Sequence, residues 1–319
     1  MPPRHEFMDR AAPFRAELTA HCYRMLGSVH DAEDLVQETY LRGWRAYPDF
    51  AGRSSLRTWL YRIATSASLR ALENRSRRAL PTGLGAPETD ADATLDRTDD
   101  GWLSPFPDAW LAPGPETAVA GRQSLRLAVV AALQELPARQ RAVLVLREVV
   151  ALPAAEVAEL LDTTTAAVNS ALQRARAHLA AVAPTEDGTA EPAEPERRAL
   201  VDRYAAAFER ADVRALTDLL REDVRLEMPP VRTWFRGRAT VVRFLAGHGF
   251  PARPGELVMV PTAANGQAAL AAYRRAGDLL QAQDLHVLTL HCGRVAGITV
   301  FLDAALFAPF GLPATRPVA

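Results

Sequence analysis

Apolar residues recur at steps of three and four positions along two long segments, residues 10–78 and 119–182. In the first segment the pattern includes Leu18, Cys22 and Met25. A stripe with this spacing is typical of helices that bury one face. The pattern therefore predicts two helical domains.

The last segment, residues 197–319, begins with the same helical spacing and ends differently. Near its end, apolar and polar residues alternate in "LHVLTLH" and "VAGITVFL", which are joined by "CGR". Alternation of this kind around a short Gly-containing turn predicts a β-hairpin. The predicted fold class is thus mainly α over the N-terminal two-thirds, followed by an α+β C-terminal domain.

Two segments lack periodicity. Residues 79–118 are rich in Pro, Gly, Asp and Thr, and residues 183–196 contain the acidic, Pro-bearing run "PTEDGTAEPAEPE". Such composition favours loops over packed elements. We therefore expect two linkers that separate three domains, a number that suits a chain of 319 residues.

Composition narrows the class of protein. Hydrophobic residues make up 49% and charged residues 24% of the chain, as in soluble globular proteins. No apolar run is long enough to span a membrane, and no signal-peptide pattern opens the sequence. Cys22 and Cys292 are far apart and form no metal-binding motif. We expect a cytoplasmic protein, monomeric when free, with no metal, cofactor or membrane contact.

The net charge of −1 conceals a strong segregation of charge. Residues 1–80 carry 13 Arg against 9 acidic residues, whereas residues 81–118 carry one Arg against 8 acidic residues. All basic residues except His are Arg, for which genomic composition is the plain explanation. The local balance, rather than the overall charge, bears on nucleic-acid binding.

The stretch "DAEDLVQETYLRGWRAYPDF" (31–50) predicts an amphipathic helix with Asp31 as its N-cap. Its spacing places Leu35, Val36, Tyr40 and Trp44 on the buried side. A solvated charged face is the ordinary explanation of the other side, but an apolar residue among acidic ones suits a docking surface better. That opposite side carries Asp34, Gln37, Glu38, Leu41 and Arg45.

A loop and a second helix follow at once, with Ser54 or Ser55 as the cap. This part combines arginines, which contact phosphates, with aromatic rings, on which unpaired bases stack. Trp59 by itself is more often a core residue than a base contact. The residues that could meet DNA here are Phe50, Arg53, Ser54, Trp59, Arg62, Ser66 and Arg70.

The stretch "DAEDLVQETYLRGWRAYPDFAGRSSLRTWLYRIA" resembles region 2 of the extracytoplasmic-function sigma factors, the promoter-recognition subunits of bacterial RNA polymerase. The resemblance implies that the first helix docks on the coiled coil of the polymerase β′ subunit. It also implies that the loop captures a base of the −10 element and that "TWLYRIA" handles melted DNA. Ser66 and Arg70 depart from the Asn and Asp usual in "RIATNxxLD", which bears on −10 preference.

The second helical segment contains a helix-turn-helix pattern in "LPARQRAVLVLREVVALPAAEVAELLDTTTAAVNSALQRARAHL" (136–179). Ala158 permits close helix approach, Val168 packs the second helix on the first, and Asp162 stands where Gly is usual in the turn. Asp tolerates left-handed backbone better than most residues. The presumed recognition helix exposes polar residues able to meet base edges and phosphates. These are Thr164, Thr165, Asn169, Ser170, Gln173, Arg174 and Arg176.

Together with the first segment, this pattern resembles sigma region 4, which reads the −35 element. The resemblance implies RNA polymerase core (β′ and β subunits) and promoter DNA as partners. It also implies that the acidic linker threads the polymerase cleft, where it could mimic RNA; a solubilising tether is the alternative. A helix-turn-helix regulator that works without polymerase is a competing hypothesis, against which the docking helix argues.

The stretches "VDRYAAAFERADVRALTDLLREDVRLEMPP" and "WFRGRATVVRFLAG" resemble SnoaL-like domains, a cone-shaped α+β fold. The resemblance implies an apolar pocket, and a domain that regulates the sigma factor in place of a separate anti-sigma protein. We expect no enzyme, although a ligand sensor or an enzyme coupled to DNA binding remains the alternative. The "DGGGK" motif of one related subgroup is absent. Candidate pocket residues are Asp202, Tyr204, Trp234, Arg236, His286 and Asp303, and no spacing among them fixes a catalytic pair.

Overall fold

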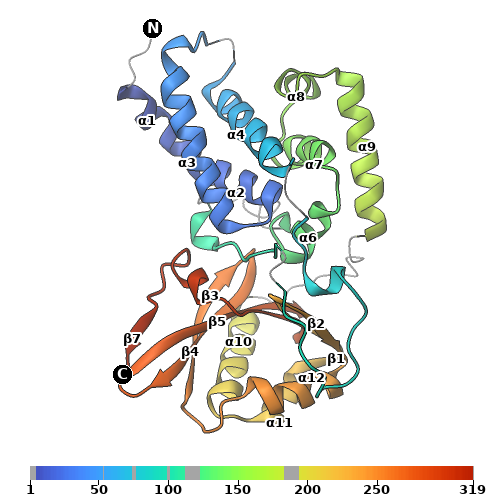
Figure 1. The fold of residues 1–319 in the computed structure, drawn as a ribbon, viewed down its shortest axis with the longest axis vertical. Coiled ribbons are helices and arrows are strands. Elements are labelled where there is room, and N and C mark those ends of the chain that lie inside the picture. The colour runs from blue at the N-terminus through green and yellow to red at the C-terminus, as the bar shows by residue number, and fades with distance from the viewer. Residues whose placement is uncertain are drawn as a thin grey trace. The chain divides into compact units, whose positions relative to one another are not determined.

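The computed structural model describes residues 5–52, 54–73, 77–98, 101–111, 123–182 and 194–318. The chain divides into two compact units (Figure 1). The first unit combines Met1–Arg78 with Trp110–Thr185, and the second combines Ala79–Ala109 with Glu186–Ala319. Each unit therefore takes up two separate stretches of sequence.

The N-terminal part of the first unit is a helical bundle. Its helices are α1 (His5–Ala11), α2 (Arg15–Leu26), α3 (Val29–Ala46) and α4 (Leu56–Leu72), with 3-10 turns at Ala12–Phe14 and Tyr47–Asp49. Phe7, Leu18, Val36 and Leu60 are fully buried between them. The helix α1 precedes the predicted helical segment, and it supplies Phe7, whose ring contacts Tyr40 and Tyr47.

The remaining helices of this unit form the predicted helix-turn-helix. They are α6 (Leu127–Gln134), α7 (Ala138–Leu144) with a π-helical turn at Val145–Val149, α8 (Ala154–Leu160) and α9 (Thr165–Val182). Val168 is fully buried and Ala158 nearly so. Asp162 adopts φ +51°, the left-handed backbone that the turn requires. Within the unit, α2 packs on α6 and α7, and α4 packs on α7.

The second unit is a curved sheet with helices on one face (Figure 1). The strand order is β2-β1-β6-β5-β4-β3, and β7 pairs with β5. Helix α10 packs on β3 and β4, while α12 packs on β1 and β2. The strands are β1 (Leu220–Met228), β2 (Val231–Arg236), β3 (Leu257–Ala264), β4 (Gln267–Ala276), β5 (Leu279–His291), β6 (Arg294–Phe301) and β7 (Thr315–Pro317). The helices are α10 (Glu194–Glu209), α11 (Val213–Leu219) and α12 (Arg238–Phe244), and the unit also has a π-helical turn at Leu245–Gly249 and a 3-10 turn at Ala304–Phe307.

The predicted β-hairpin is present as β5 and β6. His291 pairs with Arg294 across the two-residue turn Cys292–Gly293. Both turn residues have positive φ, +48° and +68°. Positive φ at both positions matches the right-handed twist of the flanking strands. The fold class predicted from the sequence is confirmed: helical domains first, then an α+β domain.

Residues 79–109, which we call the strap, differ from the linker that the sequence predicts. The strap includes a 3-10 turn at Pro81–Gly83 and belongs to the second compact unit. It forms isolated bridges to the edge strand β2 and to Ala264 at the end of β3. Ala91 and Phe106 of the strap are fully buried. A Pro- and Gly-rich segment can be ordered in this way because an edge strand offers unpaired backbone groups.

Among the helices that the structure describes, none is both long and apolar enough to cross a membrane.

Candidate functional sites

Helix α3 begins one step earlier than the sequence suggests. Its N-cap is Ser28, whose Oγ accepts a hydrogen bond from the backbone N–H of Asp31 at 3.2 Å. Asp31 is therefore not the cap, and its carboxylate instead accepts a hydrogen bond from Arg78 at 2.5 Å. Ser wins because its hydroxyl lies where it can reach the free N–H groups of the first turn.

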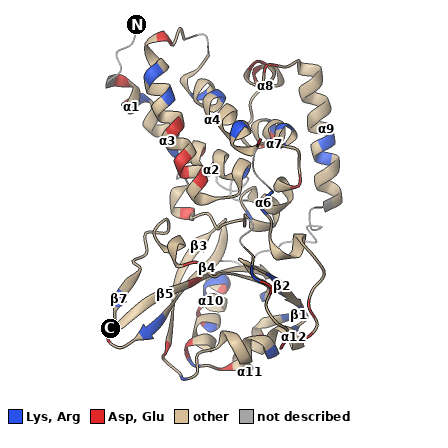
Figure 2. Cartoon of the chain, in the orientation of Figure 1, with Lys and Arg blue, Asp and Glu red and all other residues tan. Residues whose placement is uncertain are grey.

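The predicted docking residues all lie on the open side of α3. Asp34, Gln37, Glu38, Leu41 and Arg45 are exposed. Figure 2 shows acidic side chains along the first half of this helix. Glu38 also forms an ion pair with Arg42 one turn later. Leu41 is 49% exposed among these polar residues.

An apolar hollow adjoins this acidic face. Trp44 was predicted to be buried but is 38% exposed, because Tyr40 and Tyr47 fill the space beneath it. Met8, from α1, is 51% exposed beside it. Sequence reasoning missed Met8 and Arg15, since α1 shows only two turns of pattern. The hollow is lined by Met8, Arg15, Gln37, Tyr40, Leu41 and Trp44.

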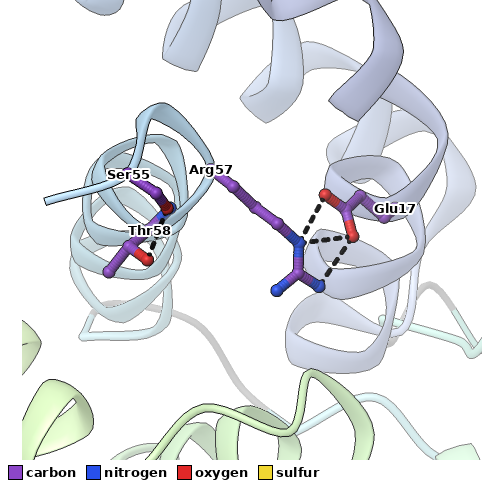
Figure 3. A network of polar contacts seen from close by, with 4 residues as sticks. All are labelled: Glu17, Ser55, Arg57 and Thr58. Atoms are coloured by element: carbon purple, nitrogen blue, oxygen red, sulfur yellow. Dashed lines mark hydrogen bonds and ion pairs between the residues drawn. The ribbon is translucent and has the colours of Figure 1, made fainter.

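The loop after α3 is held in place by a polar network at the start of α4 (Figure 3). Ser55 is the cap, with its Oγ accepting from the backbone N–H of Thr58 at 3.0 Å. Arg57 donates to both carboxylate oxygens of Glu17 at 2.8–3.0 Å, which ties α4 to α2. A two-point Arg–carboxylate contact fixes direction as well as distance. The loop therefore ends on a rigid base.

Two aromatic rings meet beside this loop. The rings of Phe50 and Trp59 are 4.9 Å apart, and both side chains are partly exposed. Trp59 is thus a half-buried platform rather than a core residue. Arg62 and Arg70 are exposed further along α4, Ser54 is exposed in the loop, and Ser66 is half-buried. Arg53 lies outside the described residues.

The polar set predicted for the recognition helix is fully accessible. Thr164 and Thr165 begin α9, and the Thr164 Oγ1 accepts from the backbone N–H of Ala167 at 3.2 Å as its cap. Asn169, Ser170, Gln173, Arg174 and Arg176 are exposed, whereas the alternating residues Val168, Leu172 and Ala175 are buried. Arg176 forms an ion pair with Glu148 at 2.5 Å. Figure 2 shows the basic band on this helix.

A buried polar chain crosses the interior of the second unit. The Tyr204 hydroxyl lies 2.8 Å from Nδ1 of His286, and Nε2 of His286 lies 2.9 Å from Oδ1 of Asp284. None of the three is more than 5% exposed. Burial raises the pKa of the Tyr204 hydroxyl well above its ordinary value, with the Asp284 charge adding to the effect.

Comparison with known proteins gives matches along most of the chain. Residues 12–78 match the Sigma-70 region 2 model, residues 126–179 the Sigma-70 region 4 model and residues 201–301 the SnoaL-like domain model. The ECF RNA polymerase sigma factor SigG of Mycobacterium tuberculosis is 50% identical over 97% of this chain and 85% of its own length. The chain belongs to the extracytoplasmic-function RNA polymerase sigma factors.

Two further relatives are similar to this sigma factor. SigJ of the same organism is 33% identical over 73% of this chain and 70% of its own length. The crystal structure of SigJ covers 95% of this chain and 98% of its own, with a TM-score of 0.62 and 24% identity. That likeness shows a common fold, with a SnoaL-like domain after the sigma regions.

Only part of the predicted pocket of this sigma factor comes together. Tyr204 and His286 meet, as described, but Asp202 and Arg236 are exposed, so neither joins them. Asp303 is exposed and caps the 3-10 turn Ala304–Phe307 through its side chain. Charged groups at these positions face solvent because burial would leave them unpaired.

One member of the buried chain was missed by sequence reasoning. Asp284 precedes His286 by two residues on β5, and residues two apart share a face of a strand. That spacing was the available signal. Trp234 has a different role from the predicted one, because its indole N–H donates to the carbonyl of Gly85 in the strap at 2.9 Å. Among the residues that the structure describes, no three potential metal ligands cluster together.

Proposed function

We propose that the exposed face of α3, together with the adjacent apolar hollow, is where this sigma factor docks on core RNA polymerase. The β′ coiled coil is the expected partner. The observation that carries the proposal is the exposure of Leu41, Trp44 and Met8 next to Asp34 and Glu38. Exposed apolar side chains rimmed by charge are typical of protein interfaces.

The second part of the proposal assigns the two DNA-reading surfaces. The Phe50–Trp59 ring pair, with Arg62 and Arg70 along α4, suits unpaired bases and phosphates of a melted −10 element. The exposed face of α9 suits the major groove of a −35 element, because its polar side chains alternate with buried ones at helical spacing.

Core-polymerase titration tests the docking surface. The double variant Asp34→Arg/Glu38→Arg should bind core enzyme at least about tenfold more weakly, since it replaces attraction by repulsion at the interface. The matched control Asp202→Arg/Asp218→Arg makes the same charge change on exposed helical positions of the other unit. Equal affinity of the two double variants would refute the docking assignment.

The C-terminal domain regulates initiation, in this proposal, by holding the strap. Five hydrogen bonds support it: backbone bonds of Glu88 to Trp234 and of Thr98 to Pro230, the Arg232 N–H to the Asp96 carbonyl, the Asp96 N–H to Thr233 Oγ1, and the Phe106 N–H to the side-chain carbonyl of Asn265, all 2.7–3.1 Å long. The strap is also the segment that connects region 2 to region 4. A domain that binds this segment constrains how the two DNA-reading regions can be placed.

Run-off transcription with core polymerase tests the regulatory role. Two conservative variants loosen the strap: Trp234→Phe removes the bond to Gly85, and Asn265→Gly removes the bond to Phe106 while keeping the left-handed φ of +58° accessible. Both should shift transcript yield in the same direction as truncation after residue 182. A shift in the opposite direction, or none, contradicts regulation through the strap.

The C-terminal domain acts, in this proposal, without catalysis. Tyr204, His286 and Asp284 are within hydrogen-bonding distance in series, but each is at least 95% buried, and the rings of Tyr204 and Phe208 pack against His286. This arrangement favours a tie between α10 and β5 over a reaction centre. A small-molecule ligand of the domain stays a prediction, and calorimetric titration of the full chain with candidate ligands is its test.

A further inference from the structure

The first unit holds regions 2 and 4 together through the end of helix α2. The last carbonyls of a helix have no partner within the helix, and they carry its partial negative charge. Helix α2 ends at Gly27, which adopts a left-handed φ of +69°. Two of its late carbonyls, those of Arg24 and Met25, accept hydrogen bonds from side chains of region 4.

The two donors are Gln134 and Arg141. The Gln134 side-chain amide donates to the Arg24 carbonyl at 3.1 Å, and the Arg141 guanidinium donates to the Met25 carbonyl. Both donors are about 96% buried. We call this contact the latch. It joins a region 4 corner to a region 2 helix end without any carboxylate among these contacts.

The latch can open without stranding a buried charge. Arg141 also donates to the carbonyls of Gln134 and Leu136 and to the Gln134 side chain, at 2.7–3.1 Å, all within region 4. Burial lowers the pKa of Arg141 to about 10, so it is charged at neutral pH. On separation, water can satisfy the freed carbonyls of α2, while Arg141 keeps its region 4 partners.

Weaker polar contacts surround the latch. Arg77 forms an ion pair with Glu135, Thr58 Oγ1 lies 3.2 Å from the Glu156 carboxylate, and Arg24 Nε donates to Ser124 Oγ at 3.1 Å. Thr58 is the residue at the start of α4 in Figure 3. Each contact pairs a region 2 residue with a residue from 123 onward. Partly exposed polar pairs contribute little individually and exchange readily with water.

The closed packing conflicts with simultaneous reading of both promoter elements. Elements centred near −35 and −10 are 25 base pairs apart by position, or roughly 85 Å at about 3.4 Å per base pair. The first unit has about 150 residues. A compact body of this size is only about 40 Å across. Its two DNA-reading surfaces cannot reach both elements while the latch is closed.

We infer that the latch holds an inactive state of this sigma factor, and that regions 2 and 4 must separate before promoter recognition. The inference rests on the proposed DNA-reading surfaces. The docking face of α3 stays exposed in the closed state. Core polymerase can therefore bind the closed protein, and opening is a later step.

Cross-linking at the rim of the latch tests the inference. The variant Cys292→Ser/Arg77→Cys/Glu135→Cys carries one accessible thiol on each side, since Cys22 is buried. A short bifunctional maleimide joins the two thiols. The matched control is the same variant with both thiols capped by N-ethylmaleimide, which has identical substitutions and no bridge.

The bridged protein should bind core polymerase within about threefold of the capped protein but give at least about tenfold less run-off transcript. Equal transcript from the bridged and capped proteins would overturn the latch. Loss of core binding by the capped protein as well would instead count against the proposed docking, so the two failures are distinguishable.

A second variant tests opening without cross-linking. Glu135→Arg places like charges across the rim and should raise transcript yield about threefold at limiting core enzyme, as expected for losing a partly exposed ion pair. Glu159→Arg, an exposed position on α8 of the same region, is the control. Yield that falls, or that matches the control, contradicts the inference.

Discussion

At the scale of single residues, one leucine distinguishes a docking face from an ordinary solvated one. Leu41 is 49% exposed between Gln37, Glu38 and Arg45. A leucine in water contributes nothing to folding but stabilises a complex when a partner covers it. This position therefore predicts polymerase affinity more directly than the acidic residues, whose charges water solvates well.

Leu41→Asp should weaken binding to core polymerase by about tenfold or more, because it removes apolar contact and buries a charge. Stability should change little, since the side chain is exposed. The control Leu84→Asp alters a leucine of similar exposure, 42%, in the strap. Fluorescence titration with core enzyme measures both, and equal affinities would contradict the assignment.

Two residues of α9 should separate base reading from phosphate contact. Asn169→Ala should cost about 1–3 kcal/mol on the cognate −35 sequence and little on other sequences. Arg174→Ala should weaken all sequences alike and reduce the salt dependence of binding by about one ion. Arg176 is less informative, because it already pairs with Glu148. Binding of the polymerase complex to promoter fragments at several salt concentrations separates the two effects.

A buried histidine should make the first unit sensitive to acid. Burial lowers the pKa of His21 to about 3, with the Arg24 charge adding to the effect. The unfolded chain binds this proton near pH 6.5, so stability is constant above that pH and falls as pH drops from about 6.5 towards 3. The loss attributable to His21 is about 2 kcal/mol between pH 7 and pH 5.

His21→Gln should remove most of this loss, since an amide can still bond Thr65, whose hydroxyl lies 2.9 Å from Nε2. Urea unfolding at pH 5 and pH 7 measures the difference. His30→Gln, at an exposed position, is the control and should keep the wild-type dependence. A histidine-free slope equal to that of the wild type would show that other groups control acid stability.

At the scale of elements, the strap shows how a segment without regular structure becomes part of a domain. Its backbone groups find partners on β2 and on the turn between β3 and β4, including the backbone N–H of Gly266, which donates to Asp108 at 2.8 Å. Phe106 and Ala91 then supply the apolar contact. The segment is ordered because β2 is an edge strand, not because of any local propensity.

Phe106→Ala should destabilise the C-terminal unit by about 3–5 kcal/mol, the usual cost of removing a buried aromatic ring. Leu84→Ala, an exposed position in the same strap, should cost less than about 0.5 kcal/mol. Amide hydrogen exchange of β2 and β4 reports the effect. Unchanged protection in the Phe106 variant would mean that the strap is not part of the folded domain.

At the scale of the whole molecule, the division of the chain crosses its domain order. The first unit takes regions 2 and 4, and the second takes the strap with the SnoaL-like domain. Chain continuity passes between the units three times, at residues 78, 109 and 185. Each unit has its own core, so each should unfold cooperatively on its own.

Calorimetry of the full chain should therefore show two transitions. Phe106→Ala should lower only one of them, and a shift from pH 7 to pH 5 should affect the other through His21. Exchange of strap amides should follow the transition that Phe106→Ala lowers. A single transition, lowered as a whole by either change, would contradict the two-unit organisation.

The sequence alone determined the helical segments, the β5–β6 hairpin, the helix-turn-helix with its left-handed Asp162, and the family. These depend on local periodicity and on residue types at fixed spacing, which short-range sterics and side-chain direction control. The exposure of Leu41 and of the α9 face also followed from helical spacing.

Only the tertiary structure decided the exposure of Trp44, the order of the strap, the Tyr204–His286–Asp284 chain and the latch between regions 2 and 4. Each depends on groups far apart in sequence: Phe7 under α3, β2 beside residue 96, α10 against β5, and Arg141 on the end of α2. Long-range contacts of this kind carry no periodic signal, because their partners are chosen by how the elements pack and by which backbone groups the packing leaves unpaired.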